Sequence, residues 1–213
     1  MPRRLIYLIV FIEGFSSLGA EIVALRRLLP HIGSAITVTA PTIALFLLAL
    51  ALGYAAGGRV RTAFLDVVRR NFLLAALLAG CGLSAVTVDI LFASAPTAFA
   101  YLLLVGGILC PIAWLLGQTV PILTNLMHTE LTGEASGQAL FWSTLGSFLG
   151  ALGLSLLVMQ WLGVSAAVLL VAAALLAGLP MLAERRLPTA LLGLAALLPI
   201  IGINLPATQV SDT

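Results

Sequence analysis

Long apolar runs follow one another along almost the whole chain, and each is long enough to cross a lipid bilayer as a helix. An α-helix rises about 1.5 Å per residue, so roughly 20 apolar residues span a hydrocarbon core of about 30 Å. Helices are favoured because they satisfy their own backbone hydrogen bonds in lipid. We therefore expect an all-α, polytopic transmembrane bundle of about seven spans forming a single domain over 1–213. The expected spans lie near 5–25, 37–57, 72–92, 98–118, 139–161, 165–183 and 189–205.

The composition supports membrane lipids as the main surroundings. Hydrophobic residues make up 62 % of the chain and charged residues 8 %, with a mean hydropathy of +1.19, whereas soluble proteins carry about 25 % charged residues. The ten basic residues are all arginine and are scattered over several loops, so no nucleic-acid partner is expected. Cys81 and Cys110 fall inside apolar runs and suggest neither a disulfide framework nor a metal site.

The distribution of arginines predicts the orientation. Cytoplasmic flanks of membrane spans retain Lys and Arg. Counting alternate segments from the amino terminus puts eight arginines on one side, whereas Arg26 and Arg27 are alone on the other. We expect a cytoplasmic amino terminus, an external carboxyl terminus if there are seven spans, and a location in a bacterial inner (plasma) membrane. A signal peptide cut after Ala20 is the alternative, although Glu13 interrupts its apolar run.

The first span carries two acids, Glu13 and Glu21, on or beside one helical stripe with Ser17. A carboxylate in lipid must be paired, protonated or next to water, so an acid inside a membrane span is a candidate functional residue. The alternative for Glu21 is a structural ion pair with Arg26 or Arg27 near the helix end.

The fourth span ends in a second polar face, formed by Gln118, Pro121 and Asn125. Pro121 lacks a backbone N–H and leaves the carbonyl near Gly117 free to face a polar cavity or a cation. A simple kink at the membrane surface is the alternative. These residues open the polar segment 119–138, in which we expect a helical extension or interfacial helix after Pro121 that ends at Gly133.

Two spans carry small residues at helical spacing. Gly53 and Gly57 lie four residues apart in the second span, and Gly146, Gly150 and Gly153 follow in the fifth. Small residues in such positions allow two helix backbones to approach closely in lipid. We interpret these glycines as helix-packing positions.

The chain lacks motifs that indicate catalysis. No nucleotide-binding glycine loop, zinc or haem spacing, or nucleophile with its base is evident on a suitable scaffold. We expect no enzymatic activity and no cofactor; a membrane enzyme acting on a lipid or a quinone-like substrate is a weaker alternative.

Two stretches carry a family resemblance. The first runs from Gly14 through Glu21 to Arg26 and is followed by Gly53, Gly57 and Gly58. The second is GQTVPILT, around Pro121, with Gly146 and Gly150 beyond it. In order and spacing they resemble the membrane region of membrane-bound spermidine synthase-like proteins. This resemblance implies a bundle distantly like half of a major-facilitator transporter; the family's aminopropyltransferase domain is missing here.

Two functional hypotheses follow. The first is a non-catalytic membrane module that acts as an anchor or as a subunit of a larger complex with other membrane or membrane-associated proteins. The second is a small transporter or binding protein for a cationic solute such as a polyamine. In that case its ligand-binding residues would be Glu13, Glu21, Arg26, Gln118, Pro121 and Asn125.

Overall fold

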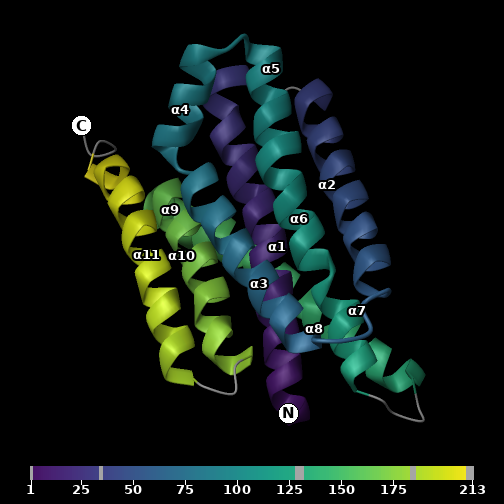
Figure 1. Cartoon of the computed structure of the whole chain (residues 1–213). Helices are drawn as coiled ribbons and strands as arrows, with labels where there is room; N and C mark the ends of the chain where they lie inside the picture. Colours follow the sequence, from purple (N-terminus) through teal and green to yellow (C-terminus); the bar gives the residue numbers. More distant parts are fainter. Residues whose placement is uncertain (1, 34–35, 128–131, 183–185, 210–213) are drawn as a thin grey trace.

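The structure, a computed structural model, describes residues 2–33, 36–127, 132–182 and 186–209. Within these ranges every element is a helix and no strand occurs. The helices run side by side as an elongated bundle, with α1 through its middle (Figure 1). The all-helical expectation is confirmed.

The elements follow one another with short connections. Several expected spans consist of consecutive helices, some joined by π-helical turns. The bounds are α1 Arg3–Ile32, α2 Ile36–Gly57, α3 Phe64–Leu77 with a π-helix Leu78–Gly82, α4 Ala85–Ser94, α5 Thr97–Leu102 with a π-helix Leu103–Leu109, α6 Cys110–Gly117, α7 Thr119–Leu126, α8 Thr132–Leu152 with a π-helix Gly153–Val158, α9 Met159–Trp161, α10 Gly163–Gly178 with a 3-10 turn Leu179–Leu182, and α11 Arg186–Gln209.

Five helical stretches of the described chain are long and apolar enough to cross a membrane. A sixth is obtained if α3 and α4, which meet at a bend of 63°, count as one broken span. The apolar part of α11, Pro188–Asn204, is shorter than these. The bundle therefore has five or six helices of membrane-spanning length, and a seventh span stays a prediction.

The third expected span, 72–92, is a bent pair of helices in the structure. Its helix begins at Phe64, eight residues earlier, and the path bends before α4. Ser84 starts α4 by accepting a hydrogen bond from the Thr87 backbone N–H at 3.2 Å, and the Thr87 hydroxyl donates to the Cys81 carbonyl at 2.7 Å. These side chains supply partners for backbone groups at the break, where lipid could not.

The expected polar loop 119–138 is mostly helical. Helix α7 covers Thr119–Leu126, and Gly133 lies in the first turn of α8 rather than at the end of the preceding helix. Pro121 is the third residue of α7, where the backbone N–H has no partner within the helix, so proline is tolerated there. Residues 128–131 lie outside the described part of the chain.

Close backbone contacts join α1 to α8. A Cβ added at Gly146 would lie 2.1 Å from the Phe11 carbonyl oxygen, and one at Gly150 would lie 2.5 Å from that of Phe15. Among the described residues, no neighbouring atom lies within 4 Å of the corresponding position at Gly153. Gly146 and Gly150 are therefore at the contact between α1 and α8, whereas Gly153 is not.

A second close contact joins α2 to the α6–α7 junction. A Cβ at Gly53 would lie 2.5 Å from the Trp114 carbonyl oxygen, and one at Gly57 would lie 2.5 Å from that of Gln118. The two contacts bring α1, α2, α7 and α8 together at one end of the bundle (Figure 1).

Candidate functional site

Glu13 lies inside the bundle at the contact between α1 and α8. Its exposed fraction is 1 %, and the Ser143 hydroxyl donates a hydrogen bond to Glu13 Oε2 at 2.9 Å. The adjacent Gly14 makes this arrangement possible, since a Cβ there would lie 2.0 Å from the Ser143 carbonyl oxygen. The tight contact of two backbones thus carries a carboxyl group into the interior.

No cation neutralises this acid in the described parts of the chain. The ion pairs there are His31 with Asp89 and Arg69 with Asp66, so neither Glu13 nor Glu21 takes part in one. The expected structural pairing of Glu21 with an arginine of its own helix end is therefore not observed. A buried acid whose hydrogen-bond donor is a neutral hydroxyl group is free to interact with a cation or a proton.

A cavity lies at the side of α2, and one of its lining residues, Tyr54, interacts electrostatically with Glu13. The cavity is open and has a volume of about 320 Å³, within the range of small-molecule sites. The other lining residues come from α7 and α8: Val120, Pro121, Thr124, Asn125, Ser136 and Leu140.

The predicted site residues do not all meet at this cavity. Pro121 and Asn125 line it, and Asn125 Nδ2 lies 3.5 Å from the Gly58 carbonyl oxygen at the end of α2. Gln118 is buried and donates to the Trp114 carbonyl within its own span. Glu21 is buried two helical turns beyond Glu13 and does not line the cavity.

Arg26 does not line this cavity. Arg26 is exposed, whereas its neighbour Arg27 turns into the bundle, because successive residues of a helix point about 100° apart. Arg27 Nε donates to the Leu83 carbonyl at 3.0 Å, and a second guanidinium nitrogen donates to the Ser165 hydroxyl at 2.9 Å.

Two buried hydroxyl groups lie beside the acids on α1. Ser16 and Ser17 have Oγ atoms without a hydrogen-bond partner in the described structure. Ser17 is one helical turn from both Glu13 and Glu21. Buried polar atoms in proteins nearly always have a hydrogen-bond partner. The hydroxyl groups of Ser16 and Ser17 are therefore available to bind water or a polar solute.

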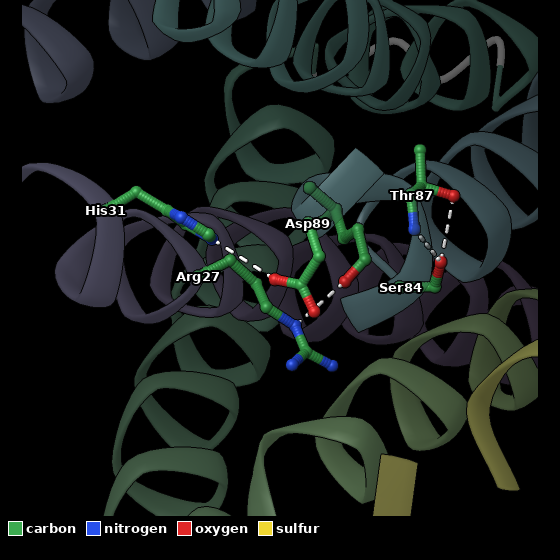
Figure 2. Close-up of polar contacts among 6 residues, drawn as sticks. Arg27, His31, Ser84, Thr87 and Asp89 are labelled. Atoms are coloured by element: carbon green, nitrogen blue, oxygen red, sulfur yellow. Dashed lines mark hydrogen bonds and ion pairs between the residues drawn. The ribbon is translucent and has the colours of Figure 1, made fainter. Parts of the chain in front are cut away.

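A second polar cluster lies near the carboxyl-terminal end of α1, and Figure 2 shows its side chains. His31 Nε2 is 3.3 Å from Asp89 Oδ1, and its ring stacks on Phe92 with centroids 4.3 Å apart. Arg27 lies within electrostatic reach of Asp89 and binds the carbonyl at the bend before α4. This cluster joins α1 to the broken third span, so its hydrogen bonds have a structural role.

Sequence reasoning missed Ser143, Tyr54 and the Arg27 cluster. Ser143 stands one turn before Gly146, so the glycine pattern could have indicated that it faces the same helix. Tyr54 has no comparable signal, because only the packing of α2 against the bundle brings it near Glu13.

The donor groups give no indication of a metal centre. Among the residues that the structure describes, no group of three or more His, Cys, Asp or Glu side chains is close enough to hold a metal ion. The site offers instead one buried acid, hydroxyl groups and amides, which suit an organic cation or a proton.

Comparison with known proteins adds no relative: no family model, curated protein or solved structure matches this chain.

Proposed function

We propose that this protein is a non-catalytic integral membrane module, related to the membrane domain of spermidine synthase-like proteins, that acts as a subunit or anchor in a larger membrane complex. The observation that best supports this proposal is the uneven burial of the helices. In the most apolar window of α1, 61 % of residues are buried, against 22 % for α2 and for α8 with α9. These two weakly covered helices offer surfaces for neighbouring transmembrane helices.

The exposed faces contain large apolar side chains. Leu47 on α2 and Phe148 on α8 are 53 % and 56 % exposed. Lipid can cover such faces, but helix–helix contacts in membranes form on them as well. A subunit role predicts a defined protein neighbour at these positions.

Photo-crosslinking in native membranes tests this role. A photoreactive amino acid at Leu47 or Phe148 should give one discrete crosslinked protein band, whereas the same group at Leu198 on α11, which is 70 % exposed, should give lipid adducts alone. Lipid adducts at all three positions, with a monomeric chain in mild detergent, would contradict the proposal.

A specific observation supports a second candidate function, binding of a cationic solute such as a polyamine. Glu13 is buried without a cation in the described structure and interacts with Tyr54, which lines the 320 Å³ cavity together with Asn125. An amine entering the cavity would gain a negative partner in a low-dielectric interior, where charge pairing is strong. Its remaining N–H groups would be near hydroxyl and amide acceptors.

Spermidine is a suitable probe for this candidate. With the purified chain in detergent, Glu13→Gln should weaken spermidine binding at least about tenfold, because the amide keeps the shape but not the charge. Glu134→Gln is the matched control, since Glu134 is exposed and bonded to Gln138 on the surface of α8. Equal affinities of the wild type and Glu13→Gln would exclude Glu13 as the cation partner.

Stability measurements separate a binding role from a folding role. Glu13→Gln retains an acceptor for the Ser143 hydroxyl and removes the cost of burying a charge, so the protein should remain at least as thermally stable. A variant that lost both spermidine binding and thermal stability would indicate a structural role instead.

A further inference from the structure

A large groove opens at the end of the bundle that carries the amino terminus. Its volume is about 870 Å³, and it lies between the beginnings of α3 and α11, with the end of α7 beside them. Its walls are mostly apolar, with a pair of charged residues on one side. The apolar lining includes Phe64, Leu65, Leu126, Leu182 and Leu192, and the charged pair is Asp66 and Arg69.

The helix ends around the groove indicate at which level of the membrane it lies. Helix α3 begins at Phe64, α7 ends at Leu126 and α11 begins at Arg186, all near the first residues of α1 (Figure 1). Ends of apolar helices lie where hydrocarbon gives way to lipid headgroups. The groove therefore has apolar walls at the depth of the upper acyl chains and charges at the depth of the phosphates.

The charge at this surface is strongly positive. The segment 59–70 contains four arginines, Arg59, Arg61, Arg69 and Arg70, against one acid, Asp66. Asp66 Oδ1 accepts from one guanidinium nitrogen of Arg69 at 2.9 Å. Guanidinium carries five N–H groups, so Arg69 keeps donors for a second anion.

We propose that this groove binds the headgroup and upper acyl chains of one anionic phospholipid, with the phosphate on Arg69. The apolar walls exclude a small hydrophilic anion as the main occupant, because its hydration would be lost without compensation. A zwitterionic lipid would fill the same walls, but it gains less from a surface with four arginines. This inference is independent of the subunit and solute proposals.

Lipid retention measures the binding directly. The full chain is reconstituted in vesicles of phosphatidylcholine with phosphatidylglycerol as the minor lipid and is re-extracted in mild detergent. The lipid that it retains is quantified by mass spectrometry. We expect phosphatidylglycerol to be enriched well above its share in the vesicles. Arg69→Gln should reduce this enrichment about tenfold, since a charge-assisted hydrogen bond is lost.

Matched variants define each part of the site. Leu192→Trp should block the groove and displace the lipid, whereas Leu191→Trp, next to it but outside the lining, should not. Asp66→Asn frees Arg69 from its ion pair and should increase phosphatidylglycerol retention. Arg26→Gln, exposed at the other end of α1, is the charge control.

Two results would overturn the proposal. The first is retention of phosphatidylglycerol and phosphatidylcholine in the vesicle ratio. The second is enrichment that survives both Arg69→Gln and Leu192→Trp in variants that elute as the wild type does on gel filtration.

Discussion

Gly146 and Gly153 look equivalent in the sequence, yet only Gly146 lies against a neighbouring backbone. Gly146→Ala should lower the free energy of unfolding by about 2 kcal/mol, because its Cβ would overlap the Phe11 carbonyl oxygen and force α1 and α8 apart. Gly153→Ala adds a methyl group in open space and should leave stability unchanged or raise it. Thermal unfolding of the two variants in the same detergent measures the difference; equal losses would show that the α1–α8 contact is looser.

At the scale of single residues, the sequence predicted which side chains are buried and polar better than it predicted which residues they contact. The apolar run around Glu13 predicted a buried acid, and Pro121 and Asn125 line one cavity together with Tyr54. Arg26 and Arg27 have identical side chains and adjacent positions, so only the rotation of α1 in the bundle decides which one turns inward. The glycine pattern could indicate which face of its helix carries Ser143, but only tertiary packing supplies Glu13 as the acceptor of its hydrogen bond.

At the scale of elements, the bend between α3 and α4 depends on a residue from another helix. Arg27 binds the Leu83 carbonyl at the break and the Ser165 hydroxyl on α10. The shorter, neutral side chain of Arg27→Gln cannot donate to both acceptors. One buried polar group should therefore lose its hydrogen-bond partner, which should lower the free energy of unfolding by about 1–3 kcal/mol. We expect faster amide hydrogen exchange in 84–94, with Arg26→Gln as the exposed control. Unchanged exchange in Arg27→Gln would show that Ser84 and Thr87 alone hold the bend.

Hydropathy could locate most spans but not this bend. The run from Phe72 to Phe92 is apolar on average, and a hydropathy average does not report the direction in which the helix axis runs. The π-helical turn Leu78–Gly82 contains Gly80 and Gly82, the break after it contains Leu83 and Ser84, and neither contains a proline. Around Pro121 the sequence predicts a helix that follows the proline, and α7 does continue beyond it, with Pro121 in its first turn, where proline is tolerated.

At the scale of the molecule, the path of the chain through the bundle determines what each membrane surface can bind. The elements that begin or end near the first residues of α1 form the arginine-rich surface with the large groove, while Asp89, His31 and Arg27 gather at the other end (Figure 1, Figure 2). The arginine count and this arrangement together predict that the groove faces the cytoplasm.

The number of crossings depends on α11. Its apolar part, Pro188–Asn204, is about 26 Å long at the helical rise per residue, slightly less than the hydrocarbon core. It is nevertheless held along the bundle: Asn204 Nδ2 donates to the Gly80 carbonyl at 2.9 Å, inside the π-helical turn of the third span, and Ile200 packs on Gly80. A short span of this kind can be accommodated by local thinning of the bilayer.

We therefore predict that α11 crosses the membrane and places the carboxyl terminus outside. Alkaline phosphatase fused to the carboxyl terminus should be active, because this enzyme folds only outside the cytoplasm. Green fluorescent protein fused at the same position should not fluoresce, because it folds only inside the cytoplasm. Fusions after Arg61 and after Ala95 provide the two references, because those positions follow α2 and α4 and should report the cytoplasmic and external sides. Fluorescence from the full-length fusion, with both references as expected, would mean that α11 lies in the interface instead of spanning, and that the bundle has six crossings.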